Sequence, residues 1–123
     1  MNSRILVVDD SALSRRRLRQ ILEPAGYEVA EADDGLSALE RYFIDKPDVV
    51  LLDLVMKGMY GLEVLAKLRE LDANAKVVVV SADIQTSSQN LAEAAGARGF
   101  ISKPFEKADI LKALENVLTG ARE

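Results

Sequence analysis

The sequence predicts one α/β domain, an open and doubly wound sheet of five parallel strands with five helices on its two faces. Short apolar runs alternate along the chain with stretches whose apolar residues recur every three or four positions. The first pattern is typical of buried strands and the second of amphipathic helices. The strand runs are almost wholly apolar, as in a parallel sheet that is covered on both faces.

Three strands and two helices are predicted in the first half of the chain. The strands are the runs at residues 4–8, 27–32 and 49–52. Ser11 is a suitable N-cap for the first helix, which ends near Gly26. The apolar face of this helix is expected to contain Leu18, Ile21, Leu22 and Ala25. The second helix is expected to turn Leu36, Leu39 and Phe43 toward the core.

Two strands and three helices are predicted in the second half. The strands are residues 76–80 and 98–101. The third helix carries Leu62, Leu65 and Leu68. The fourth helix, at residues 87–95, has little apolar surface to bury. The last helix has the clearest amphipathic pattern, with Ile110, Leu111, Leu114, Val117 and Leu118 on one face. We expect no second domain in residues 1–123.

Composition excludes several classes of function. With 16 Lys and Arg against 20 Asp and Glu, the net charge of −4 argues against a nucleic-acid binder. No apolar run is long enough for a membrane span and no signal peptide is evident, which favours the cytoplasm. The chain has no Cys and no His, so it cannot build a thiol nucleophile, a Ser-His-Asp triad or a histidine metal site.

A cluster of arginines marks the predicted first helix. Its members are Arg15, Arg16, Arg17 and Arg19. Charge runs of this kind usually form a solvated helix face, and that is the interpretation we favour. The alternative is a docking surface for an acidic partner.

Polar residues stand at the carboxyl ends of four predicted strands, where open parallel sheets bind their ligands. They are Asp9, Asp10, Asp53, Ser81 and Lys103. An ionised Asp53 at the end of a buried strand is costly unless its charge is compensated. The alternative is that Asp53 has no functional role and only begins a loop. The other strand ends favour a functional role, because they bring carboxylates, a hydroxyl and an ammonium to the same edge.

Carboxylates clustered in this way indicate a metal and a phosphoryl group. Three of them repel one another, so one takes up a proton or a cation binds among them. Only oxygen ligands are available, which favours Mg²⁺. An aspartate can itself attack phosphorus to form an aspartyl phosphate. Lys103 is a natural partner for one phosphoryl oxygen, and Ser81 can donate a hydrogen bond to another.

These residues, with Pro104 after Lys103, resemble the receiver domain of two-component response regulators, and the likeness covers essentially the whole chain. Without an output domain, the chain is most similar to the stand-alone receivers of chemotaxis. The resemblance implies a flavodoxin-like fold with strand order 2-1-3-4-5. It also implies a phosphorylation-activated signalling switch and not an enzyme, apart from phosphotransfer to itself and slow loss of that group.

The resemblance assigns a role to each residue of the site. Asp53 accepts a phosphoryl group from a phosphohistidine on a sensor histidine kinase. Asp10, Asp53 and the backbone carbonyl of Val55 bind Mg²⁺, and Asp9 acts largely through water. Ser81 acts as a switch that moves to contact a phosphoryl oxygen, and Lys103 pairs with the phosphoryl group.

The resemblance also implies how the signal is passed on. Phe100 matches an aromatic switch that turns inward on activation, although an aromatic that only packs is an equally good interpretation. The face of helix 4, strand 5 and helix 5 would be read by a target such as a flagellar-motor component or a phosphatase. The Lys103–Pro104 bond is a candidate for the cis form. We expect a monomer or a weak dimer that binds neither nucleic acid nor membrane.

The chain departs from the family motif just after Asp53. The family usually reads Asp-x-x-Met-Pro-x-x-Asp/Asn-Gly, whereas residues 53–61 read DLVMKGMYG. Lys57 therefore replaces a rigid proline and Tyr60 a small polar residue. An exposed Lys57 without an ion pair is the interpretation we favour. Val55 and Asp83 flank the expected approach of a hydrolytic water, so we expect both to influence dephosphorylation.

Three other functions are compatible with the architecture. An Asp-nucleophile phosphatase would normally carry Asp-x-Asp, but Val55 stands at the second position. A flavodoxin-like FMN binder would need a phosphate-binding loop, which the sequence lacks. A constitutive interaction module that is never phosphorylated is disfavoured because all five site residues are present.

Overall fold

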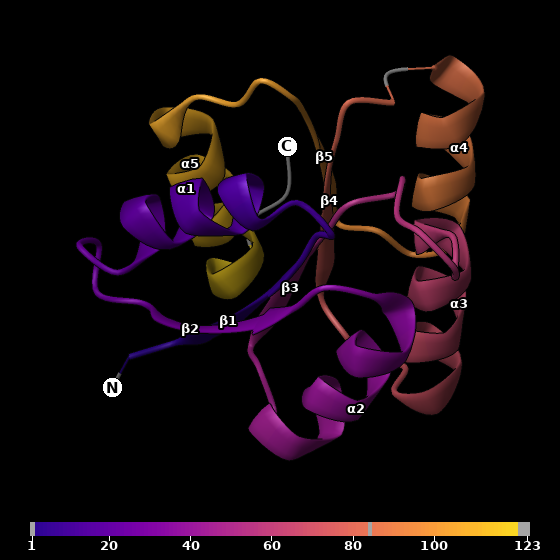
Figure 1. Cartoon of the computed structure of the whole chain (residues 1–123), viewed down its shortest axis with the longest axis horizontal. Helices are drawn as coiled ribbons and strands as arrows, with labels where there is room; N and C mark the ends of the chain where they lie inside the picture. The colour runs from indigo at the N-terminus through magenta and orange to yellow at the C-terminus, as the bar shows by residue number, and fades with distance from the viewer. Residues whose placement is uncertain (1, 84, 121–123) are drawn as a thin grey trace.

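The computed structural model describes residues 2–83 and 85–120 and confirms the predicted α/β architecture (Figure 1). The strands are β1 (Arg4–Val8), β2 (Glu28–Ala32), β3 (Val49–Leu52), β4 (Val77–Ser81) and β5 (Gly99–Ser102). The helices are α1 (Ala12–Leu22), α2 (Gly35–Asp45), α3 (Gly61–Leu71), α4 (Thr86–Ala94) and α5 (Lys107–Thr119). All strand pairs are parallel and the order is β2-β1-β3-β4-β5. None of the helices in this described part is long and apolar enough to cross a membrane.

The helices form two layers around the sheet, with α1 and α5 on one face and α2, α3 and α4 on the other (Figure 1). Alternate residues of each strand supply the two cores. Leu6 and Leu52 pack on the side of α2, α3 and α4, whereas Ile5 and Leu51 pack on the side of α1 and α5. Every residue of β3 and β4 is buried, which explains their uninterrupted apolar runs.

Strand boundaries differ from the predicted ones by a single residue. The second strand begins at Glu28, β4 covers Val77–Ser81 in place of 76–80, and β5 covers Gly99–Ser102 in place of 98–101. Helix α4 likewise covers Thr86–Ala94 in place of 87–95. The reason is pairing: Ser81 lies opposite Ser102 in the register, so polar residues extend both strands beyond their apolar runs.

The predicted apolar face of α2 is wrong. Leu36 and Phe43 are 72% and 50% exposed, and only Leu39 of the predicted set packs partly against the core. The buried residues are Gly35, Ala38 and Tyr42. The start of the helix lies so close to the loop after β3 that Gly35 must be small: a Cβ there would come within 2.7 Å of the Cβ of Met59.

Ala25, which was predicted on the apolar face of the first helix, is also exposed. Helix α1 ends earlier, at Leu22, and a turn follows at Gly26, which has φ of 96°. The predicted N-cap is confirmed, since the Ser11 hydroxyl accepts a hydrogen bond from the Ser14 N–H at 3.2 Å. Helix α4 has little buried surface, as predicted: only Ser88 and Ala92 are buried.

The arginine cluster of α1 divides into two pairs. The solvated-face prediction is confirmed for Arg16 and Arg17, which are exposed, with Arg17 lying over the Phe105 ring. It is wrong for Arg15 and Arg19. Their guanidinium groups both form ion pairs with Glu31 of β2, at 2.9 and 2.7 Å.

We expect Gly61→Ala to destabilise the protein by about 2 kcal/mol or more, because overpacking at a rigid backbone contact is costly. The Gly61 N–H donates to the Leu54 carbonyl at 2.9 Å, and a Cβ here would collide with the Asp53 carbonyl oxygen and the Leu54 Cα. The measurement is urea unfolding followed by circular dichroism. Gly99→Ala is the control, since its nearest neighbour would be Val78 Cγ1 at an ordinary 3.5 Å. Equal unfolding midpoints for the two variants would contradict this account.

Candidate functional site

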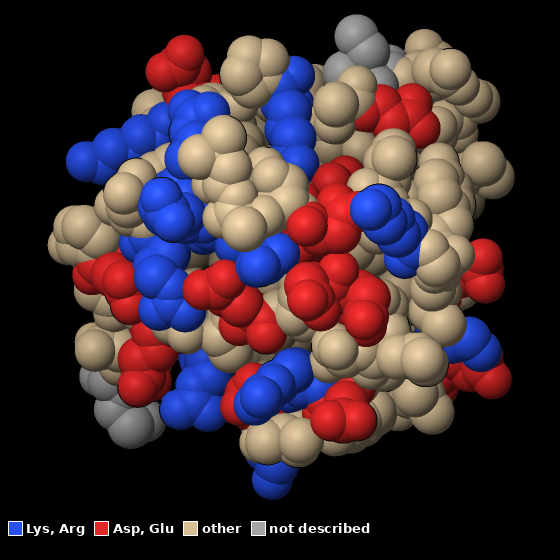
Figure 2. Space-filling view, in the orientation of Figure 1, with Lys and Arg blue, Asp and Glu red and all other residues tan. Residues whose placement is uncertain are grey.

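The parallel register brings the predicted site residues to one edge of the sheet. Asp9 and Asp10 follow β1, Asp53 follows β3, Ser81 ends β4 and Lys103 follows β5. Backbone bonds continue the ladder into this edge, with the Asp53 N–H donating to the Val8 carbonyl and the Lys103 N–H to the Ser81 carbonyl, both at 2.9 Å. Figure 2 shows acidic side chains gathered near the middle of the face, with basic side chains beside them.

Lys103 is the cation of the site. Its ammonium lies 2.6 Å from Asp9 Oδ2 and 3.2 Å from Asp53 Oδ2. Asp9 and Asp53 are buried, with 2% and 6% exposure. Burial lowers the pKa of Lys103, but the bond to Asp9 and the charges of both carboxylates raise it more, so the net pKa lies above its ordinary value. The Lys103 ammonium is therefore charged at neutral pH.

Each carboxylate is also held by a backbone N–H from the loop that follows it or faces it. The Ser11 N–H donates to Asp9 Oδ1 at 2.9 Å, and the Val55 N–H to Asp53 Oδ1 at 3.1 Å. Asp10 is exposed, and its Oδ2 accepts from the Lys57 N–H at 3.2 Å. Both oxygens of Asp9 and of Asp53 are thus engaged, whereas Asp10 keeps one oxygen without a partner among the described residues.

The three aspartates fit a hard divalent cation. One oxygen from each of Asp9, Asp10 and Asp53 lies within 4.8 Å of the others. Three carboxylates against one ammonium leave two negative charges uncompensated, and an all-oxygen donor set of this kind suits Mg²⁺. The contribution of the Val55 carbonyl stays a prediction.

Ser81 is completely buried, and its Oγ accepts a hydrogen bond from the Asp83 N–H at 3.2 Å. The hydroxyl hydrogen is therefore still available to another acceptor. Phe100 of β5 is half-buried against the core on the side of α3 and α4, and the Lys103–Pro104 bond is cis as predicted. The switching roles of Ser81 and Phe100 stay predictions.

A second hydroxyl, which was not predicted, lies near the lysine: Ser14 Oγ is 3.4 Å from the Lys103 ammonium. Its position three residues after the N-cap, in the first turn of α1, was the available signal. Tyr60, whose role was not predicted either, donates its hydroxyl to Asp83 Oδ2 at 3.3 Å. Ser88 of α4 donates to the same oxygen at 2.7 Å. Tyr60 thus joins the loop after β3 to the loop after β4.

Fold and site together define a parallel α/β domain with three clustered carboxylates and one lysine at the carboxyl edge of its sheet. A sequence profile of the response regulator receiver domain matches residues 5–115, a range that contains every site residue described above. The chain therefore belongs to the response regulator receiver domain family, the receivers of two-component signalling.

Similar proteins include receivers of chemotaxis. The chemotaxis protein CheY of Thermotoga maritima is 42% identical over 118 residues, which are 95% of this chain and 98% of that protein. A CheY-like receiver domain protein from Methanospirillum hungatei has a TM-score of 0.93 and 29% identity, over 98% of this chain and 97% of that chain. A chain of the CheX–CheY–BeF₃–Mg²⁺ complex from Borrelia burgdorferi has a TM-score of 0.89 and 32% identity, over 94% of this chain and 88% of that chain.

We expect Asp10→Asn to stabilise the metal-free protein by about 1 kcal/mol, because it removes one of the two uncompensated charges. The amide oxygen of Asn can still accept the Lys57 N–H. The measurement is urea unfolding in EDTA. Asp34→Asn is the matched control: Asp34 is also exposed and also accepts one backbone N–H, from Ser37 at 2.7 Å, but it caps α2 outside the carboxylate cluster. A loss of stability in Asp10→Asn, with Asp34→Asn unchanged, would contradict the repulsion argument.

Proposed function

We propose that this receiver is a phosphorylation-activated switch whose acceptor is Asp53. The observation that carries the proposal is the buried Asp53 carboxylate, which lies 3.2 Å from the Lys103 ammonium and within reach of Asp9 and Asp10. A new P–O bond forms to Asp53 as the P–N bond to a phosphohistidine of a sensor kinase breaks, and the kinase imidazole leaves. The chain itself contains no histidine, so the donor belongs to another protein.

Asp10, Asp53 and the Val55 carbonyl would hold Mg²⁺ directly, with Asp9 acting through water. Bound there, Mg²⁺ offsets the negative charge of the transferring phosphoryl group. The two adjacent aspartates differ in a way that supports this division: both oxygens of Asp9 already accept bonds, whereas one oxygen of Asp10 has no partner among the described residues. The presence of BeF₃ and Mg²⁺ in the similar Borrelia complex is in keeping with it.

The remaining polar groups position the phosphoryl oxygens. Lys103 pairs with one oxygen, since its ammonium already faces Asp53. Ser81 donates its hydroxyl hydrogen to another, while its Oγ keeps accepting from the Asp83 N–H. These groups serve transfer to Asp53 and the slow loss of the phosphoryl group, and we propose no other enzymatic activity.

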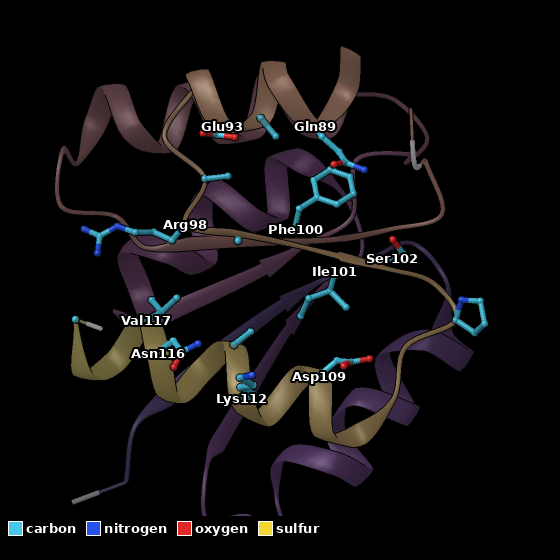
Figure 3. A pocket seen from close by; sticks show the side chains of 16 residues that line it. Gln89, Glu93, Arg98, Phe100, Ile101, Ser102, Asp109, Lys112, Asn116 and Val117 are labelled. Atoms are coloured by element: carbon cyan, nitrogen blue, oxygen red, sulfur yellow. The ribbon is translucent and has the colours of Figure 1, made fainter. Parts of the chain in front are cut away.

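A target protein would read the face formed by α4, β5 and α5. A groove of about 910 Å³ lies between these elements, and Figure 3 shows Phe100 and Ile101 of β5 between the two helices. Charged side chains of both signs line it, including Glu93, Arg98 and Lys112. Phe100 links the groove to the site, because it lies in β5 three residues before Lys103. Its inward turn would change this surface when Asp53 is phosphorylated.

The similarity to chemotaxis receivers favours a flagellar-motor component or a phosphatase as the target. We expect residues 1–123 to act in the cytoplasm as a monomer or a weak dimer.

Incubation with acetyl phosphate and Mg²⁺ tests the acceptor. We expect the intact mass to rise by one phosphoryl group in the wild-type protein and in Asp34→Asn, but not in Asp53→Asn. Removal of Mg²⁺ with EDTA should slow the labelling by about tenfold or more, because the charge on the phosphoryl group is then left uncompensated. Labelling that persists in Asp53→Asn would overturn the assignment.

A further inference from the structure

We propose that the backbone N–H of Lys57 is a positioning group for the magnesium site. It holds the Asp10 carboxylate ready for the metal, so that this receiver binds Mg²⁺ more tightly than it would with a proline at this position. The inference deepens the proposed function and rests on it, since it concerns the same metal site.

Asp10 is the one aspartate of the cluster that needs such a restraint. Asp9 and Asp53 are buried and tied to Lys103, but Asp10 is exposed and has no cation partner among the described residues. In this part of the chain, the Lys57 N–H is the only donor to its carboxylate, at 3.2 Å. Without that bond the side chain would be free to leave the cluster.

The donor is fixed by the loop and not by the side chain of Lys57, which is exposed and forms no ion pair in the described part. The next residue, Gly58, has φ of 83°, a left-handed conformation that turns the loop back toward the site. Met59 then packs against Gly35, where a Cβ added to the glycine would come within 2.7 Å of the Met59 Cβ. The loop ends at Gly61, whose N–H donates to the Leu54 carbonyl at 2.9 Å.

These contacts restrain the loop even though Lys57 replaces the rigid proline of the family motif. Residue 57 therefore keeps a backbone N–H that a proline would lack. A carboxylate oxygen has two acceptor positions, and the other oxygen of Asp10 has no partner among the described residues. Mg²⁺ can therefore bind Asp10 without displacing the Lys57 N–H. The bond lowers the entropy cost of binding and offsets part of the repulsion among the carboxylates.

The test compares Lys57→Pro with Lys57→Ala. Both variants lose the ammonium group, but only the proline also lacks the N–H, and it fixes φ at residue 57 as well. Mg²⁺ binding is measured by isothermal titration calorimetry on the full chain. We expect the proline variant to bind Mg²⁺ about three- to tenfold more weakly than the alanine variant, a range that corresponds to the typical net contribution of one hydrogen bond. Equal affinities, or tighter binding by the proline variant, would overturn the inference.

Two further measurements separate the possible failures. If the wild-type protein binds no Mg²⁺, the proposed function fails and not only this inference. If Lys57→Pro does not fold, the amide proton of Lys57 is followed by NMR in the wild-type protein and in Asp10→Ala. We expect that proton to exchange faster and to shift upfield in Asp10→Ala, because its acceptor is gone. An unchanged signal would mean that the bond does not form in solution.

Discussion

The ammonium of Lys103 makes the rest of the site possible. Burial of Asp9 and Asp53 at the ends of β1 and β3 would be very unfavourable without a cation between them. Lys103 reaches both because β5 runs parallel to β4, and its backbone N–H is fixed to Ser81 at 2.9 Å. The same ion pairs connect the first, third and fifth strands at their carboxyl ends. Both the chemistry of the site and the contacts between the ends of these strands thus depend on the Lys103 side chain.

One ammonium does not neutralise three carboxylates, and the remaining negative charge gives the site its chemical character. Without a metal, the negative charge at this edge favours the binding of a divalent cation. A phosphoryl group on Asp53 would add negative charge and favour that binding again. The two adjacent aspartates differ in burial and in partners. Asp9 is buried and held by Ser11 and Lys103, whereas Asp10 is exposed and, among the described residues, is held by one backbone N–H.

The sequence was sufficient for the elements and for most of the site, because both follow from local patterns and from one rule about parallel sheets. Apolar runs located the strands to within a residue, and the polar residues that follow these runs lie together at one edge of the sheet. The orientation of α2 could not be predicted, since it depends on the close approach of Gly35 to Met59, two residues far apart in sequence. The bonds from Lys57 N–H to Asp10 and from Tyr60 to Asp83 were equally inaccessible, because a backbone donor and a loop-to-loop contact leave no signature in residue type.

Through those two hydrogen bonds, the loop after Asp53 connects the β1 side of the site with its β4 side. Through Lys57 it holds Asp10, a proposed metal ligand, on the β1 side, and through Tyr60 it holds Asp83 on the β4 side. The N–H of Asp83 in turn bonds to the Ser81 hydroxyl, and its carboxylate also accepts from Ser88 of α4. The bond from Ser88, followed by the Gln85 N–H, lowers the pKa of Asp83, so this carboxylate is ionised at neutral pH and accepts both hydroxyls. A metal or a phosphoryl group that displaces this loop must therefore act on the Ser81 hydroxyl and on the start of α4 as well. The small buried surface of α4 makes that helix the element that yields most easily, and it forms one wall of the groove beside Phe100.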